Sequence, residues 1–400
     1  MPERRVGLWL IGALGGVGST VALGLAALRR GLTDRTGMVT ALPDFAGLDL
    51  DEPAAFVVGG HDIRRGGWPG SVADLARRIG AFDPAVVDAC TPDLEAWTTN
   101  LRAGTVINSD DTIAALADRP ELPRAASLRT EFARLRDDLQ QFRDRHRLAQ
   151  VVVVNVASTE PAVAERPEFN SIEQLRQHVE AAGLSALPVS SVYALASLEA
   201  GCPYVNFTPS AGASLPALEE LAATRGVPIA GRDGKTGETL VKTVLAPMFA
   251  RRNLRLLSWV GHNILGNLDG RVLNDPRHKE SKVRSKDQVI REIVGYPVQT
   301  HTSIEYIESL DDWKTAWDHV HFQGFLGVRM ALQFTWQGCD SALAAPLVID
   351  LARLTLLAQR RGQGGVLRHL ACFFKSPMGV GEQDFFRQFA LLEDYIESVT

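Results

Sequence analysis

Residues 6–31 read VGLWLIGALGGVGSTVALGLAALRRG, and this stretch decides the fold. A membrane helix needs about 20 mostly apolar residues, and a secretion signal combines a basic start, an apolar run and small residues at its cleavage site. The run is long enough for either, but four glycines interrupt it between residues 12 and 18. Each glycine costs a helix interior about 1 kcal/mol. The pattern therefore predicts a buried strand, a glycine turn and a helix that ends at Gly31.

A strand, a glycine turn and a helix open the nucleotide-binding βαβ unit, in which backbone N–H groups at the helix start hold a diphosphate. The spacing here is G-x-x-G-G-x-G rather than the usual G-x-G-x-x-G. We favour dinucleotide binding, while a purely structural turn and a signal or anchor segment stay open as alternatives. The candidate cofactor residues of the turn are Gly12, Gly15, Gly16, Val17 and Gly18.

A second apolar strand is predicted within AAFVVGGHDIRRGG (54–67), and it ends at Asp62. In nucleotide-binding folds an acidic residue at this place often holds the ribose hydroxyls of the adenosine. Asp62 lies farther from the glycines than the usual distance of about 20 residues, so an insertion precedes it. Alternatively, Asp62 caps a helix or is an ordinary loop carboxylate, and the sequence favours neither interpretation over the other.

Composition narrows the class of protein. The 400 residues are 46% hydrophobic and 22% charged, with a net charge of −5, which is ordinary for a globular enzyme and gives no basic surface for nucleic acid. The cysteines are far apart and form no C-x-x-C pair. This spacing argues against a zinc site or a disulfide framework and fits a reducing cytoplasm. We expect a cytoplasmic protein with no metal site and no membrane or nucleic-acid partner.

Strands and helices alternate as far as residue 235, which is typical of a doubly wound α/β sheet. The valine run in AQVVVVNVAST (149–159) predicts a parallel strand covered on both faces, with Asn155, Ser158 and Thr159 at its ligand-binding end. Residues 126–147 have one apolar stripe and predict a long helix. TGMVTALPDFAGL (36–48) predicts a short strand that leads into a loop.

The alternation changes at residue 236. Residues 236–339 read as strands of a mixed sheet, and helices return from residue 340. We therefore predict a Rossmann-like domain from residues 1–239 and 340–400, and a central mixed-sheet α+β domain from residues 240–339.

Polar stretches in the second half carry candidate chemistry. GRDGKTGET (231–239) fails the P-loop pattern, because Ile229 stands where its first glycine is required; it predicts either a phosphate-binding turn or a plain helix start. GHNILGNLDG (261–270) predicts either a plain hairpin or a functional loop. The lysines at 279, 282 and 286 would share one helix face, either as a solvated surface or as a site for a sugar phosphate. Lys314 and Lys375 have aromatic or small neighbours, and a partly buried lysine can serve as an acid or base.

These stretches occur in a fixed order that resembles the myo-inositol-1-phosphate synthases, also called inositol-3-phosphate synthases. The matching motifs are GALGGVGST, NFTPSAGASLPAL, GRDGKTGET, GHNILGNLDGRVL followed by KESKVRSK, DDWKTAWDH, CDSALAAPLVIDL and FFKSP. The resemblance runs from residue 8 to about residue 380. It implies a Rossmann domain built from both chain ends and a central sheet domain that assembles a homotetramer.

The resemblance also implies an NAD-dependent isomerase acting on glucose 6-phosphate. In that chemistry C5 of the open-chain sugar is oxidised, an enolate forms at C6 and attacks the C1 aldehyde, and the ketone is then reduced. Net redox is zero and the product is 1D-myo-inositol 3-phosphate. Ammonium groups suit the negative charge that each step places on a sugar oxygen.

The resemblance assigns roles to single residues. Lys282 would transfer the proton at the C5 oxygen, Lys286 would hold the phosphate or the aldehyde oxygen, Lys314 would stabilise the C1 oxygen, and Lys375 would lie beside the C5 oxygen. Asp233 would lie near the nicotinamide and the lysines. The cofactor side would also include Asp62, Thr159, Asp340 and Ser341. The expected substrate-binding residues are Thr236, Gly237, Asn263, Leu265 and Asn267.

The chain departs from the family pattern at several positions, and these departures leave the identity of the sugar substrate undetermined. Gly16-Val17 replaces paired asparagines, Leu268 stands where Asn is usual, and Glu238 stands where Gln is common beside the phosphate turn. A carboxylate there would repel a phosphate unless it points away or meets a cation. A family variant that forms a five-membered cyclitol phosphate from fructose 6-phosphate, a simple NAD-dependent dehydrogenase and a non-catalytic family member are the alternatives.

Overall fold

The computed structural model describes residues 4–120, 122, 127–182, 187–267, 270 and 289–400. Its larger part is a parallel sheet of seven strands with the order β11-β6-β5-β4-β1-β2-β3. The strands are β1 (Val6–Ile11), β2 (Phe56–Asp62), β3 (Leu101–Ala103), β4 (Gln150–Asn155), β5 (Tyr204–Asn206), β6 (Pro228–Gly231) and β11 (Gly365–Val366). The chain runs outward from β1 to β3 and then returns to β4 on the other side of β1. This reversal creates the crevice where such sheets bind ligands.

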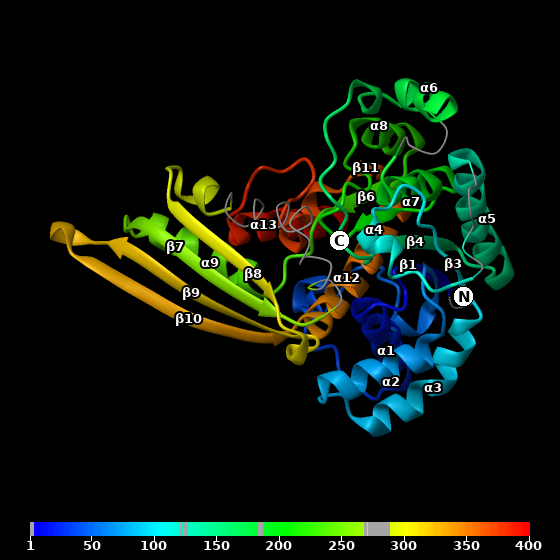
Figure 1. The fold of residues 1–400 in the computed structure, drawn as a ribbon, viewed down its shortest axis with the longest axis horizontal. Helices are drawn as coiled ribbons and strands as arrows, with labels where there is room; N and C mark the ends of the chain where they lie inside the picture. The colour runs from blue at the N-terminus through cyan, green and yellow to red at the C-terminus, as the bar shows by residue number, and fades with distance from the viewer. Residues whose placement is uncertain (1–3, 121, 123–126, 183–186, 268–269, 271–288) are drawn as a thin grey trace.

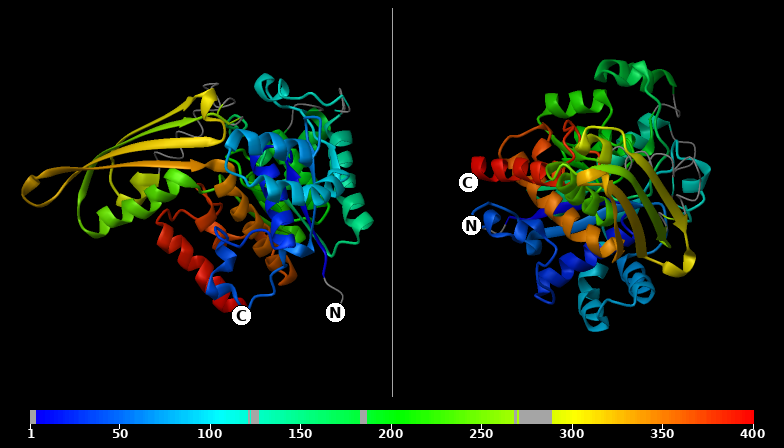
Figure 2. Two further views of the ribbon diagram at one scale, coloured as in Figure 1. Left: turned by 90° about the horizontal axis from the view of Figure 1, so that it is seen from below. Right: turned by 90° about the vertical axis from the view of Figure 1, so that its left-hand side faces the viewer.

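Helices cover both faces of this sheet (Figures 1 and 2). On one face α1 packs against α12, with α2 and α3 beside α1, and on the other α5 packs against α7 and α6 against α8. Their bounds are α1 (Gly16–Arg30), α2 (Trp68–Ile79), α3 (Pro84–Thr98), α4 (Asp111–Ala114), α5 (Leu128–His146), α6 (Ile172–Ala182), α7 (Val189–Glu199), α8 (Pro216–Arg225), α12 (Asp340–Arg360) and α13 (Phe385–Val399).

A second sheet extends away from the first and has the order β10-β9-β7-β8 (Figure 1). Its strands are β7 (Arg255–Leu265), β8 (Gln299–Tyr306), β9 (Trp313–Gln323) and β10 (Arg329–Cys339). β7 and β8 are parallel and the other pairs are antiparallel, so the sheet is mixed. Helix α9 (Gly237–Arg251) covers one face, where Phe249, Trp259 and Val320 form a separate core.

The predicted fold class, a Rossmann-like parallel sheet with a second mixed sheet, is confirmed. The opening stretch is β1, a glycine turn and α1, which ends at Gly31 in the left-handed conformation. The predicted long helix is α5, with Leu135 and Leu139 buried. The short strand expected within residues 36–48 is wrong. Two 3-10 helices occupy the segment, because the backbone N–H of Val39 and the hydroxyl of Thr40 bond to Asp350 of α12.

Among the described residues, α12 is long and apolar enough by composition to cross a membrane. In this structure 78% of its most apolar window is buried, and the helix packs on α1, β4 and β6. It is a core helix of the larger part.

Candidate active site

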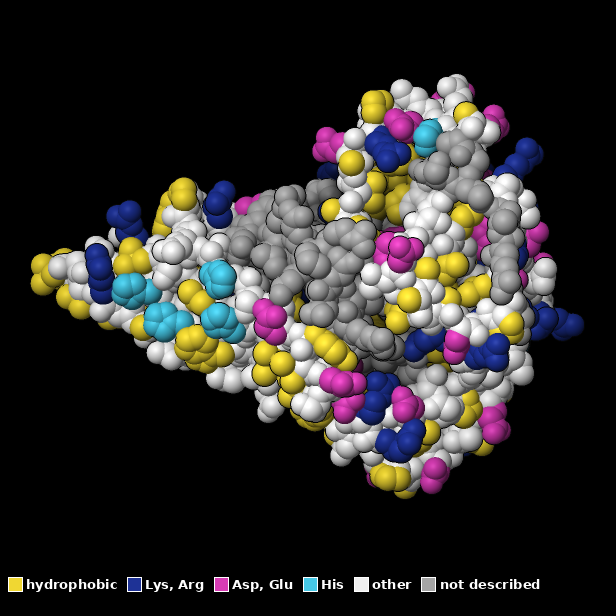
Figure 3. All heavy atoms as spheres, viewed as in Figure 1, with side chains coloured by type: hydrophobic (Ala, Val, Ile, Leu, Met, Phe, Trp, Pro, Cys, Tyr) yellow, Lys and Arg dark blue, Asp and Glu magenta, His cyan; other side chains and the backbone are white. Residues whose placement is uncertain are grey.

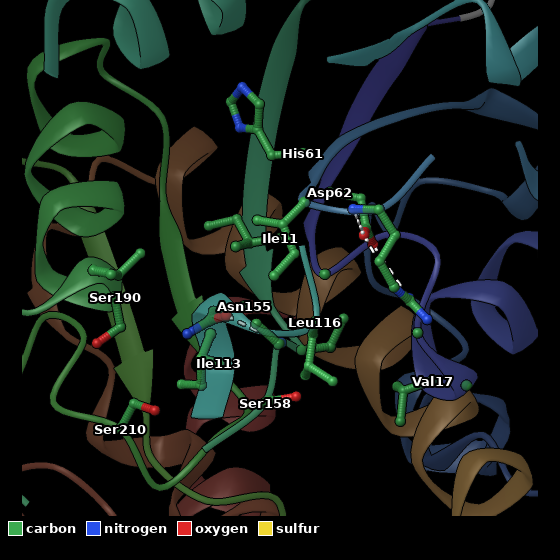
Figure 4. A pocket seen from close by; sticks show the side chains of 18 of the residues that line it. Ile11, Val17, His61, Asp62, Ile113, Leu116, Asn155, Ser158, Ser190 and Ser210 are labelled. Atoms are coloured by element: carbon green, nitrogen blue, oxygen red, sulfur yellow. Dashed lines mark hydrogen bonds and ion pairs between the residues drawn. The ribbon is translucent and has the colours of Figure 1, made fainter. Parts of the chain in front are cut away.

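A cavity opens at the carboxyl ends of β1 and β4, at the reversal of strand order (Figure 4). It is lined on the α1 side by Gly12, Gly15, Gly16 and Val17, with Asp62 and Arg64 nearby. On the β4 side Asn155, Ser158, Glu160, Ser190 and Ser210 line it. Its position agrees with the predicted dinucleotide site.

The glycine turn leaves no room for side chains. Gly12 has φ +80°, and a Cβ on it would lie 2.7 Å from Cα of Ala157. A Cβ on Gly16 would lie 2.5 Å from Oγ of Ser341, and one on Gly18 would lie 2.5 Å from the carbonyl oxygen of Ala13. No side chain caps the N-terminus of α1. Backbone N–H groups at this helix start are thus available to a diphosphate, so the residues fit a dinucleotide.

Asp62 ends β2, where the sequence predicted the end of the second strand, and it lines the cavity. Its contact with the ribose stays a prediction. Its carboxylate accepts the backbone N–H of Leu14 at 2.7 Å, the N–H of Arg64 at 2.9 Å and Nε of Arg64 at 3.2 Å. Asp62 therefore fixes the glycine turn as well as facing the site, and Arg64 adds a cation that the sequence did not single out.

Thr159 lies between two lining residues, Ser158 and Glu160, and is itself buried outside the cavity lining. Glu160, which was not predicted, is buried against the cavity, and its carboxylate accepts the backbone N–H of Ser190. Burial raises the pKa of Glu160. The polar character of this wall comes from Glu160 and its neighbours rather than from Thr159.

Asp312 is another cavity residue that the sequence did not indicate. Its carboxylate accepts the backbone N–H and the hydroxyl of Ser341, both at 2.9 Å, and the thiol of Cys339 at 3.0 Å. Burial raises the pKa of Asp312. Through Ser341, which faces Gly16, Asp312 ties the start of α12 to the glycine turn. The only sequence signal is its place beside Lys314 in DDWKTAW.

Lys375 and Asp233 form an ion pair, with 2.8 Å between Nζ and Oδ1. Backbone bonds hold the two segments side by side, including Lys375 N–H to the Asp233 carbonyl at 2.7 Å and Lys235 N–H to the Phe373 carbonyl at 2.8 Å. Among the described residues, Oδ2 of Asp233 is buried with no hydrogen-bond partner. The pair lies at a second cavity, which Arg232, Lys375 and Ser376 help to line.

Lys235 lies two residues after Asp233, and its backbone N–H bonds to the carbonyl of Phe373. Its ammonium group donates to Oε1 of Gln388 and lies 5.9 Å from the ring centre of Phe385, both on α13. Burial lowers the pKa of Lys235 to about 8. Helix α13 therefore supports the turn that carries Asp233.

Lys314 lies on β9 near the junction of the two sheets, with Nζ 4.0 Å from Oδ2 of Asp340. Asp340 is the first residue of α12, directly before Ser341. Among the described residues, Oδ1 of Asp340 is buried and has no hydrogen-bond partner. Asp340 thus links the lysine side of the site to the glycine turn.

The predicted substrate residues lie on neighbouring elements. Thr236 precedes α9, and Gly237 begins it with φ +54° under the ring of Trp336. Asn263 and Leu265 are buried on β7, Leu265 opposite Lys314, and Asn267 lines the first cavity. Leu265 therefore contributes packing.

Lys282 and Lys286 lie outside the described residues. Within the described ranges no three His, Cys, Asp or Glu side chains form a metal-binding group.

The chain is similar to known proteins over nearly its whole length. A model of an NAD-binding family described as myo-inositol-1-phosphate synthase matches residues 6–397. Inositol-3-phosphate synthase 1 of Bacteroides thetaiotaomicron is 31% identical over 99% of this chain and 95% of its own length. The human inositol-3-phosphate synthase 1 is 31% identical over 89% of this chain and 68% of its own length.

A solved structure shows the same fold. The inositol-3-phosphate synthase of Caenorhabditis elegans has a TM-score of 0.88 and 25% identity, and the match covers 99% of this chain and 86% of that one. The predicted resemblance and NAD as the cofactor are confirmed. The chain belongs to the myo-inositol-1-phosphate synthase family.

Proposed function

We propose that this protein converts D-glucose 6-phosphate to 1D-myo-inositol 3-phosphate, with NAD used and regenerated in each turnover. The observation that carries the proposal is a glycine-turn cavity lined by Ser341, next to the Lys314–Asp340 pair, in a chain that matches the family from residue 6 to residue 397. The Lys375–Asp233 pair lies at the second cavity. A plain dehydrogenase needs the cavity but has no use for ammonium groups at several sugar oxygens.

The glycine turn at the start of α1 would hold the diphosphate of NAD, and Asp62 would face its ribose. Bound NAD supplies reversible hydride acceptance at C5 of the sugar. Two hydrogen bonds to Asp312 hold Ser341 against Gly16, and they fix the position of this wall of the cofactor cavity. Thr159 would support this wall from behind.

The lysines would stabilise charge on sugar oxygens. Asp233 holds the Lys375 ammonium at 2.8 Å, which orients it toward the C5 oxygen, and Lys282 would move the proton there. Asp340 orients Lys314 toward the C1 oxygen, where negative charge develops as the ring closes. Lys286 would hold the phosphate together with Thr236 and Gly237, and Asn263 and Asn267 would contact the sugar.

We also propose a cytoplasmic homotetramer that assembles through the central sheet, with residues 240–339 as the assembly domain. The face of this sheet opposite α9 is open in one chain and carries a group of histidines (Figure 3). Two rows that cross it contain no Lys, Arg, Asp or Glu: Ser303, His262, Trp317 and Thr335, and His301, Val260, His319 and Gln333. Depletion of charge is the signature of a protein contact.

Phosphorus and proton NMR of the protein with NAD and glucose 6-phosphate, then with fructose 6-phosphate, tests the function. An inositol phosphate from the glucose ester, without net NADH absorbance, is expected. Turnover of the fructose ester alone would replace the proposal with the five-membered-ring variant, and stoichiometric NADH would replace it with a dehydrogenase.

A further inference from the structure

Glu238 is the residue whose charge opposes the proposed substrate. It lies in the first turn of α9, directly after Thr236 and Gly237, where the phosphate would bind. A phosphate gains from the positive potential of a helix N-terminus, and a carboxylate in the same turn competes for that potential. The chain must therefore offset Glu238.

The structure contains the compensating cation one helical turn later. Nζ of Lys242 lies 2.6 Å from Oε1 of Glu238 and 3.6 Å from Oδ1 of Asp318 on β9. The side chains of Glu238 and Lys242 are each 1% exposed and that of Asp318 is 0% exposed. A surface role for Lys242, such as solubility, is thereby excluded.

The surrounding strands are shaped around this pair. A Cβ on Gly261 of β7 would lie 2.7 Å from Oε1 of Glu238, 3.0 Å from Oδ1 of Asp318 and 3.2 Å from Nζ of Lys242. Trp259 donates its ring N–H to Oδ1 of Asp318 at 2.6 Å. The missing side chain at Gly261 leaves room for the charges, and Asp318 is held in place from the other side.

Lysine usage points the same way. The chain has seven lysines among 42 lysines and arginines, and all seven lie between residues 235 and 375. Arginine supplies nearly all of the other positive charge. A lysine in such a chain marks a place that needs a compact ammonium group rather than a planar fork, and the proposed reaction leaves Lys242 without an assigned role.

We propose that Lys242 is a positioning residue that pairs with the Glu238 carboxylate and reduces its repulsion, so that the start of α9 can receive the phosphate of the sugar substrate. The inference rests on the proposed function for the identity of the substrate. It explains how a carboxylate is tolerated where a neutral amide would serve, and it predicts that changing Lys242 costs less when Glu238 is changed as well.

The test is a double-mutant cycle with Glu238→Gln, Lys242→Met and both changes together. The probes are the KM for glucose 6-phosphate and the Kd of inorganic phosphate for the NAD-loaded protein. Lys242→Met alone should weaken phosphate binding and raise KM by about tenfold or more, because it removes the ammonium group that lies 2.6 Å from the buried carboxylate of Glu238. The double variant should bind phosphate more tightly than Lys242→Met, because the amide introduced at position 238 carries no negative charge. The recovery should be partial, because Asp318 loses the same ammonium group. The NAD affinity should not change.

If Lys242→Met does not fold, Glu238→Gln alone still tests whether the carboxylate opposes phosphate binding. It should bind inorganic phosphate as tightly as the original protein or more tightly. Arg251→Met removes a positive charge at the far end of the same helix, where Arg251 pairs with Asp384, and should leave phosphate binding unchanged. A double variant as weak as Lys242→Met, or weaker phosphate binding in Glu238→Gln, would overturn the proposal. Phosphate binding is read without turnover, so an inactive original protein would refute the proposed function and leave this test intact.

Discussion

Gly16 is the residue at which the cofactor cavity and the start of α12 meet. An added Cβ would lie 2.5 Å from Oγ of Ser341 and 3.3 Å from Oδ1 of Asp312, so that Gly16→Ala must displace the hydroxyl that shapes the cavity wall. We expect the Kd for NAD, measured by titration calorimetry, to rise about tenfold or more. Gly24→Ala is the matched control in the same helix, because its nearest neighbour is Cδ1 of Ile349 at 3.9 Å.

Gly24→Ala should leave NAD binding unchanged and raise the free energy of unfolding by about 0.5–1 kcal/mol, because alanine is the better helix residue. Equal NAD affinity in Gly16→Ala and the original protein would show that the glycine turn does not face the cofactor.

Asp233 is expected to act only through Lys375. Asp233→Asn removes the carboxylate that holds the ammonium at 2.8 Å, and the loss of one oriented donor typically lowers kcat by about 100-fold or more. Lys375→Met should be similarly impaired. The double variant should be no worse than Lys375→Met, because residues that act as a unit are not additive. Steady-state kinetics decide this, and independent, multiplying losses would separate the two roles.

At the scale of elements, α13 is joined to the 3-10 helix η8 (Arg368–Phe373) by His369, whose ring stacks on Tyr395 with 3.7 Å between ring centres. Burial lowers the pKa of His369 to about 4. Between about pH 4 and pH 6.5 the ring of His369 is therefore neutral in the folded protein but protonated in the unfolded chain. The stabilising contribution is complete above pH 6.5 and is lost as the pH falls toward 4, up to about 3 kcal/mol.

His369→Phe keeps the stack and removes this titration. The free energy of unfolding, measured in urea at pH 7.5 and pH 4.5, should fall less on acidification in the variant than in the original protein. Comparing the two proteins cancels the other titrating groups, such as Asp350, whose pKa burial raises to about 6 with the opposite effect on stability. Identical losses in both proteins would contradict the account.

Elements were predictable where the residues themselves carry the pattern. The glycines before α1, the valines of β4 and the stripe of α5 each encode a local structure. The segment around Val39 was not predictable, because its turns depend on Asp350, a residue 311 positions away. The site follows the same division. Family motifs indicated Asp233 and Lys375, whereas Asp312 and Glu160 reach the cavity wall only through packing between distant segments.

At the scale of the whole molecule, the open sheet face should decide the assembly. Trp317 is 39% exposed and stacks on His262 with 5.8 Å between ring centres. Trp317→Glu places a charge in a row that has none, so that light scattering should give a smaller particle with an unchanged circular dichroism spectrum. Leu32→Glu is the control at an exposed apolar residue of the other part. An unchanged particle mass in Trp317→Glu would exclude this face as the contact.

The central claim is that one site oxidises, cyclises and re-reduces the same sugar. The most direct measurement uses glucose 6-phosphate with deuterium at C5 and follows the product by proton and deuterium NMR while NADH absorbance is recorded. The account predicts an inositol phosphate that retains deuterium at the corresponding carbon, with no accumulation of NADH. Deuterium released to water, or recovered in NADH in proportion to an oxidised sugar, would contradict it.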